Sequence, residues 1–157
     1  QKESAFSEES LIGEAVTMAG INIFRTRTKR ERLALDMYDP EGEEPVMDPA
    51  WAHLETVYEL LLKLVGSKDK DKEASVGKFV NQRFMQQALD MFDTDDPRER
   101  DCLKSLLKSM YSKFPPLRSG IRRGIQDVCL KAAQEGVVQN GMPELLEILA
   151  RIVTGFS

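Results

Sequence analysis

Basic side chains gather between Lys104 and Lys131, and they are the residues of this chain best suited to bind another molecule. The segment holds seven lysines and arginines and a single acid, Asp127, so its net charge is +6, whereas the whole chain of 157 residues has a net charge of -4. Arginine can grip a carboxylate or a phosphate with two parallel hydrogen bonds, and lysine offers a point charge. The segment therefore indicates either a site for an acidic partner or a solvated cationic face, and spacing alone favours neither.

The order of these residues places them on two neighbouring helices. Lys104, Lys108 and Tyr111 follow at i, i+4 and i+7 on one helical face, and Arg118 and Arg122 follow at i, i+4 after two consecutive prolines. A tight turn at the prolines brings both faces side by side. A nucleic-acid backbone would also be attracted to this charge. The acidic remainder of the chain and the lack of interleaved aromatic residues favour an extended acidic peptide over nucleic acid.

Residues for catalysis or metal binding are scarce. The chain has one histidine, His53, and two cysteines, Cys102 and Cys129, whereas a closed zinc site needs four ligands. Phosphate-binding glycine loops are missing from the sequence, and no apolar run approaches the roughly 20 residues of a membrane span. We expect no enzyme, cofactor, metal or membrane span. Two free thiols are favoured over a disulfide, which stays an alternative if the proline turn joins antiparallel helices.

Apolar residues recur at helical spacing between stretches rich in proline, glycine and charge, which predicts an all-α chain. Pro49, Pro97 and Pro143 each suit the first turn of a helix. Asp48 and Asp96 precede the first two prolines and can cap the free backbone N–H groups. Glu99, three residues after Asp96, can return a hydrogen bond to that cap.

The three prolines are 48 and 46 positions apart, and units of two helices with a period of ~40–47 residues are typical of HEAT and armadillo-like solenoids. We therefore expect an α-solenoid fragment of stacked antiparallel helix pairs, with an irregular helical bundle as the alternative. The expected parts are a helix of a preceding repeat at 1–24, a loop at 25–47, repeats at 48–92 and 96–136, and the start of a further repeat at 142–157. The first of these repeats is expected to hold a solvated loop at 67–75 and a helix at 78–92 with a break near Asn81.

Three stretches together resemble the regulatory B-prime subunits of protein phosphatase 2A: "DPEGEEPVMDPAWAHLETVYELLLKLV", "DTDDPRERDCLKSLLKSMYSKFPPLRSGIRRGI" and "NGMPELLEILARIVTGF". The resemblance runs from about Ile21 to Phe156 and covers only the early repeats of the family. It implies a HEAT-like solenoid without catalytic activity, which docks on the scaffold and catalytic subunits of the phosphatase and selects substrates. It also implies an intracellular protein of the cytoplasm, the nucleus or both.

The resemblance further implies a peptide groove for L-x-x-I-x-E motifs, which often carry acids or phosphoserines nearby. Ile148 and Ile152 would form the apolar pocket for the leucine of the motif, although their spacing alone favours plain core packing. The residues expected to bind the peptide are Ser105, Lys108, Tyr111, Arg118, Arg122, Glu147, Ile148 and Ile152.

Two departures from the family pattern lie in this groove. The family has His-Arg where this chain has Lys108 and Ser109, so the two-pronged grip on the glutamate of the motif is lost at Ser109, while Lys108 can still offer a point charge. The family's "FLGLR" turn is "FPPLR" here, which stiffens the corner and retains Arg118. The alternative function is therefore a structural scaffold or adaptor segment whose peptide site is lost or altered.

Overall fold

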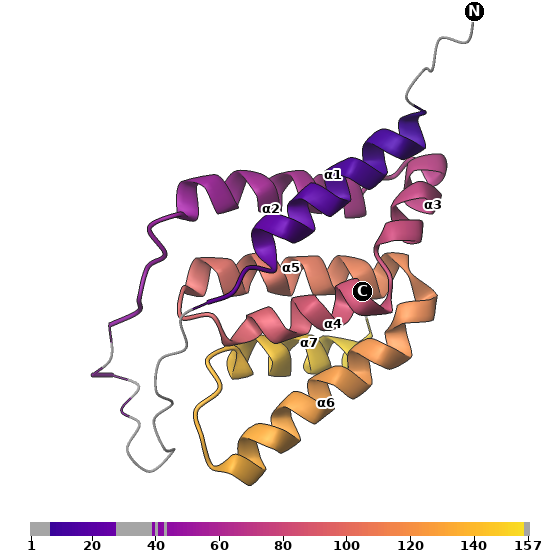
Figure 1. The fold of residues 1–157 in the computed structure, drawn as a ribbon. Helices are drawn as coiled ribbons and strands as arrows, with labels where there is room; N and C mark the ends of the chain where they lie inside the picture. The colour runs from indigo at the N-terminus through magenta and orange to yellow at the C-terminus, as the bar shows by residue number, and fades with distance from the viewer. Residues whose placement is uncertain (1–6, 28–38, 40, 43, 156–157) are drawn as a thin grey trace, which may run out of the picture.

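The computed structural model describes residues 7–27, 39, 41, 42 and 44–155. Over these residues the chain forms helices arranged in two layers, without a β-strand (Figure 1). One layer consists of α2 (Trp51–Val65), α5 (Pro97–Lys113) and α7 (Met142–Thr154), with α5 packed between the other two. The second layer contains α1 (Glu8–Ile23), α3 (Lys70–Phe79), α4 (Gln82–Asp90) and α6 (Arg118–Glu135), and the short 3-10 helices are η2 (Met91–Asp93) and η3 (Pro115–Leu117). The stacked pairs confirm the predicted all-α solenoid fragment.

At the start of α5 the predicted cap by Asp96 is present, but the predicted return bond from Glu99 is not. The carboxylate of Asp96 accepts a hydrogen bond from the backbone N–H of Arg98, and Pro97 is the first helical residue, as expected. Glu99, however, does not return a bond to this cap. Its side chain is fully buried and points to residues of other segments, so the prediction of a reciprocal capping box was wrong.

The other two starts also lie close to their prolines. Asp48 accepts a hydrogen bond from the backbone N–H of Ala50, and α2 begins two residues after Pro49. Helix α7 begins one residue before Pro143, which lies in its first turn. Because a cap and a proline act locally, they locate helix starts to within two residues.

The charged stretch at 67–75 is largely helical, which corrects the expectation of a loop there. Helix α3 begins at Lys70, and the carboxylate of Asp69 caps it by accepting from the backbone N–H of Asp71. Lys70 and Glu73 form an ion pair at i, i+3, at 3.5 Å. The break near Asn81 is confirmed, since α3 ends at Phe79 and the Asn81 side chain caps α4.

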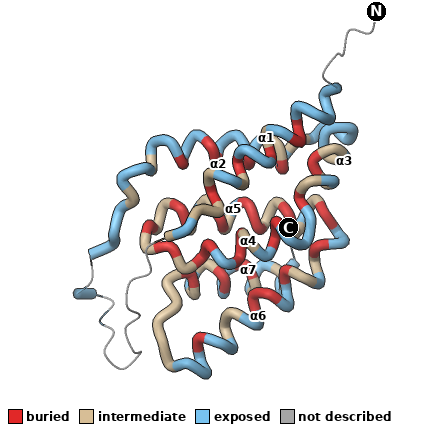
Figure 2. The backbone as a smooth tube through the Cα atoms, viewed as in Figure 1, coloured by how far each residue is buried: buried red, intermediate tan, exposed pale blue. Residues whose placement is uncertain are grey.

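The core lies between the two layers, and its buried positions recur along the inner faces of the helices (Figure 2). Gly124 of α6 is buried against Leu89 of α4, so closely that a methyl group at this position would collide with the leucine side chain. None of the described helices is long and apolar enough to cross a membrane. The largest fully buried side chains are those of Tyr58, Phe92, Ile23, Leu54, Leu61, Leu89, Leu103, Leu106, Leu107, Met110, Ile121 and Ile125.

Both cysteines are free and partly buried, as the favoured interpretation of the sequence expects. The thiol of Cys129 lies 3.4 Å from the sulfur of Met142 on α7. Burial, with a smaller contribution from the Asp101 carboxylate, raises the pKa of the Cys102 thiol to about 11. Neither thiol is therefore activated for nucleophilic chemistry.

Candidate peptide-binding surface

Two lysines of α5 clasp one glutamate of α7. The Lys108 ammonium lies 2.7 Å from one carboxylate oxygen of Glu147, and the Lys104 ammonium lies 2.9 Å from the other. Lys104 also pairs with Asp101 at 3.3 Å. The hydrogen bonds from Lys108 and Lys104 lower the pKa of Glu147 to about 2. We call Lys104, Lys108 and Glu147 the α5–α7 clamp.

Two arginines surround Tyr111 at the end of α5. The guanidinium of Arg118 donates to the backbone carbonyls of Tyr111 and Ser112, at 2.8 and 3.2 Å, and lies 5.5 Å from the centroid of the Tyr111 ring. Arg122 donates to the hydroxyl of Tyr111 at 2.8 Å. Arg118 therefore satisfies carbonyls that have no partner within the last turn of α5, while its charge faces an aromatic ring. We call Tyr111, Arg118 and Arg122 the Tyr111 cluster.

The remaining predicted residues differ in their exposure. Ser105 is exposed on α5. Ile148 is fully buried in the core, and Ile152 is partly buried and packs against the core. In this conformation only Ile152 of the isoleucine pair offers surface to a ligand. The core packing that the spacing alone favours is thus what the structure has for Ile148.

The structure brings the predicted cations of α5 to Glu147, and those that follow the prolines to Tyr111. Lys108 and Tyr111 are one helical turn apart on α5, so the clamp and the Tyr111 cluster are neighbours on that helix. Each cation of the two groups already has a partner within the chain. An anionic ligand at this surface must therefore share or replace these contacts.

Sequence reasoning missed a buried polar site at the other end of α5. One oxygen of Glu99 accepts from Arg25 at 2.8 Å and from the Tyr58 hydroxyl at 2.9 Å, and the other accepts from Arg25 at 3.0 Å and from the Thr94 hydroxyl at 2.8 Å. Arg25 also pairs with Asp48 at 2.6 Å. Burial raises the pKa of Tyr58, and the nearby charge of Glu99 raises it further.

This Glu99 site is built for stability and not for turnover. All the strong acceptors of the buried carboxylate are filled by donors from α2, from the residues after α1 and from the turn before α5, so none is left for a substrate. The sequence signal that could have found it is Arg25, an arginine that directly follows a predicted helix and would need an acid if buried.

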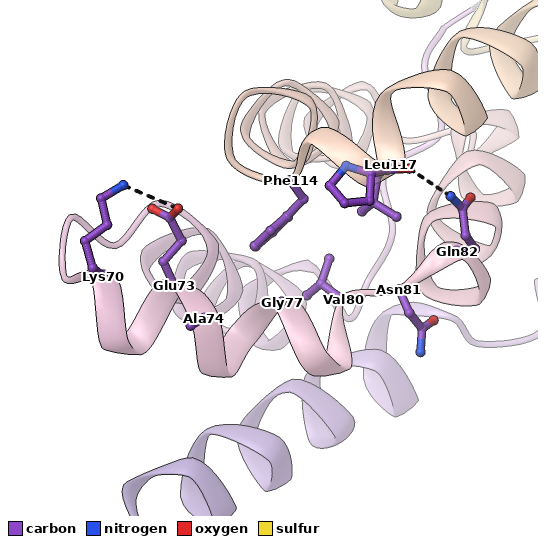
Figure 3. A pocket seen from close by; sticks show the side chains of 10 residues that line it. Lys70, Glu73, Ala74, Gly77, Val80, Asn81, Gln82, Phe114 and Leu117 are labelled. Carbon is purple, nitrogen blue, oxygen red and sulfur yellow. Dashed lines mark hydrogen bonds and ion pairs between the residues drawn. The ribbon is translucent and has the colours of Figure 1, made fainter.

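A separate pocket of about 470 Å³ lies where α3, α4 and the proline turn meet (Figure 3). Phe114, Leu117 and Val80 form its apolar wall, and the Gln82 amide donates to the backbone carbonyl of Pro116 at 3.3 Å across one side. The ion pair of Lys70 and Glu73 lies at its rim. Sequence reasoning gave no indication of it, because it forms only where the broken helix meets the turn.

Comparison with known proteins decides the family. The model of the family described as "Protein phosphatase 2A regulatory B subunit (B56 family)" matches residues 1–157. The chain belongs to the B56 family. This agrees with the resemblance read from the sequence, and the relatives carry the names of regulatory subunits and not of catalytic ones.

The B56 relatives come from plants and animals. The B' theta isoform of the 57 kDa regulatory subunit in Arabidopsis thaliana is 44% identical over 151 residues, which are 95% of this chain and 30% of the relative. The delta and alpha isoforms of the human 56 kDa regulatory subunit are 42% and 41% identical; each match covers 95% of this chain, and 25% and 30% of the relative. The chain thus spans about a quarter to a third of the length of the curated B56 proteins it matches.

Proposed function

We propose that this chain is part of a non-catalytic regulatory subunit of protein phosphatase 2A, and that it recruits substrates through a groove for acidic L-x-x-I-x-E-type motifs. Membership of the B56 family supports the regulatory role. The observation that supports the groove is the row of cations along α5 and the start of α6, where the clamp adjoins the Tyr111 cluster. The proposed partners are the scaffold and catalytic subunits of the phosphatase and the acidic or phosphorylated peptides of substrates, in the cytoplasm, the nucleus or both.

The groove would capture a peptide by combining charge with apolar contact. Arg118 and Arg122 present guanidinium groups that suit the carboxylate or phosphate of the motif. Ile152 offers a partly exposed apolar side chain on α7 for the leucine of the motif. Charge complementarity of this kind governs orientation and association rate, while the apolar anchors supply most of the binding free energy.

Titration calorimetry with an acidic L-x-x-I-x-E peptide tests this function. Changing Arg118 to Glu should weaken binding by about 1–3 kcal/mol, the scale of a charged hydrogen bond. Because Arg118 also caps α5, circular dichroism of the variant must establish that it is folded. Arg83, exposed on α4, provides the matched control, since Arg83→Glu makes the same charge change outside the groove. Equal affinity of wild type and the Arg118 variant would remove Arg118 from the site.

The second candidate function is a scaffold or adaptor segment with a lost or altered peptide site. Three observations favour it: Lys104 and Lys108 are both paired with Glu147, Ile148 has no exposed surface, and position 109 is a serine. A chain that binds the phosphatase subunits in pull-down experiments and shows no heat of binding with the peptide would support this candidate.

A further inference from the structure

We propose that Glu147 acts as a resident counter-ion that competes with acidic ligands for the two lysines of the α5–α7 clamp. The inference rests on the proposed peptide-binding function, and it names a regulation of that same groove. Glu147 is the residue that an incoming carboxylate would have to displace. It would set a threshold that only a ligand with further favourable contacts can overcome.

The geometry of the clamp is that of a bound carboxylate. Each oxygen of Glu147 meets a different lysine, with 2.7 Å to Lys108 and 2.9 Å to Lys104, so both oxygens are occupied at once. The hydrogen bonds from both lysines lower the pKa of Glu147 to about 2, so the carboxylate stays ionised in mild acid as well as at neutral pH. The same contacts, with Glu147 first among them, raise the pKa of Lys104. An acidic peptide side chain would seek this same pair of ammonium groups.

Exposure makes the exchange feasible. The side chain of Glu147 is 46% exposed, whereas those of Lys104 and Lys108 are 21% and 26% exposed. The two lysine side chains are thus largely covered where α5 meets α7. The Glu147 carboxylate is more exposed to solvent and can rotate away into water. Solvent-exposed ion pairs contribute little to stability, so opening the clamp costs little. The cost nevertheless subtracts from the affinity of every anionic ligand that uses these lysines.

The spacing of the clamp and the Tyr111 cluster gives the competition a role in selectivity. A ligand with a single carboxylate at the clamp merely replaces Glu147 and gains little. Arg122 lies on α6 and donates to the hydroxyl of Tyr111. A ligand that reaches Arg122 as well as the clamp gains a contact for which Glu147 does not compete. The counter-ion would therefore reject isolated acids and retain peptides that span both groups.

Peptide binding by the 157-residue chain provides the first test. We expect Glu147→Gln to raise the affinity for an acidic L-x-x-I-x-E peptide about three- to ten-fold in low salt, because a neutral amide competes less well for ammonium groups. The matched control is Glu14→Gln, which removes the same charge from an exposed acid on α1, outside the groove. Because salt screens a distant exposed charge, this control should change the affinity by less than about two-fold.

Inorganic phosphate provides a second test that needs no peptide. In nuclear magnetic resonance spectra of lysine-labelled protein, phosphate should shift the side-chain signals of Lys104 and Lys108 in Glu147→Gln at concentrations at least about three-fold lower than in wild type. Equal concentrations would overturn the inference. Dispersed lysine signals in the spectra of both wild type and Glu147→Gln show that both proteins are folded, so that their phosphate titrations can be compared.

The two tests separate the failure of the inference from that of the proposed function. If Glu147→Gln leaves peptide binding unchanged or weakens it, the inference that Glu147 competes with the peptide is wrong, while the proposed peptide groove is retained. If neither wild type nor Glu147→Gln binds the peptide, the proposed function fails, and the phosphate titration alone decides whether Glu147 occupies the clamp as a competitor.

Discussion

Arg25 and Glu99 lie 74 positions apart in the chain, and the guanidinium of one donates two hydrogen bonds to the carboxylate of the other, at 2.8 and 3.0 Å. Glu99 is fully buried, while the Arg25 side chain is 24% exposed. The pair joins the end of α1 to the first turn of α5. Because a buried carboxylate needs compensation, these two residues hold the segment after α1 against the start of α5.

Removing the arginine of this pair should destabilise the protein strongly. We expect Arg25→Ala to lower the free energy of unfolding by about 3–5 kcal/mol, since the buried charge of Glu99 is left with two hydroxyl donors alone. Urea denaturation followed by circular dichroism measures the loss. Arg27→Ala is the matched control, because Arg27 makes an exposed hydrogen bond of 3.2 Å to the carbonyl of Asp90. A similar loss in both variants would contradict the special role of Arg25.

Two helical glycines should respond to alanine in opposite directions. A methyl group at Gly124 would collide with the buried side chain of Leu89, so Gly124→Ala should destabilise by about 1–3 kcal/mol. At Gly20 the nearest side-chain atom, on Phe24, is 3.6 Å from the added carbon, so Gly20→Ala should stabilise by about 0.5–1 kcal/mol. Thermal melting measures both, and an unchanged or raised melting temperature of Gly124→Ala would show that the approach of α6 to α4 is not limited by Gly124.

Asp96 should make stability depend on pH in the acid range. Burial alone would raise the pKa of Asp96, but hydrogen bonds from Arg98 and from the backbone N–H of Asp48 outweigh it and lower the pKa below the ordinary value of 3.8. A lowered pKa in the folded state means that the stabilisation is complete above pH 3.8 and is lost as the pH falls through the folded pKa.

Comparison with Asp96→Asn isolates this contribution. At pH 7 the variant should be less stable by about 1.5–3 kcal/mol, the scale of hydrogen bonds to a charged group. The difference from wild type should shrink as the pH falls from 3.8 through the lowered folded pKa, at which Asp96 itself becomes protonated. Denaturation curves between pH 7 and pH 2.5 measure it, and a difference that stays constant over this range would show that the charge of Asp96 does not contribute.

The number of free thiols per chain should be two, whether or not a reductant is added. Both thiols should react slowly in the native protein. Because burial raises the pKa of Cys102 to about 11 and also raises that of Cys129, few thiolates exist at pH 8. We expect slow reaction with a disulfide reagent in the folded state, and rapid release of two equivalents after denaturation without reductant. No release under the second condition would indicate that the cysteines are joined.

The helix starts could be predicted from the sequence because their causes are local. An aspartate before a proline defines the start of α5 through a contact across two residues, and Asn81 interrupts the second-layer helix in the same way. The start of α3 at Lys70 also has a local cause, the Asp69 side chain that caps it, but the charged composition of 67–75 is that of a loop and hides this signal. Glu73 reaches Lys113 of α5 at 3.2 Å, a contact between distant residues that the sequence does not show.

The sequence predicts which cations share a helical face, but not the residues with which they pair. Spacing places Lys104 and Lys108 on one face of a helix, yet only the register between α5 and α7 brings Glu147 to them. Glu99 gives the reverse case. In sequence it has the position of a capping glutamate, and only the burial of the α5 start, with Arg25 beside it, turns it into the centre of a polar network.

The residues that precede α2, α5 and α7 are bonded to one another. The backbone N–H of Asp48 donates to the carboxylate of Asp96, and the Asn140 side chain donates to the carboxylate of Asp95, pairs that lie 48 and 45 positions apart. A helix start in one unit is thus completed by groups from its neighbour. If one unit unfolds, the helix start of the adjoining unit therefore loses a hydrogen-bond partner. Heat or force should accordingly unfold the units together in one cooperative transition and not one after another.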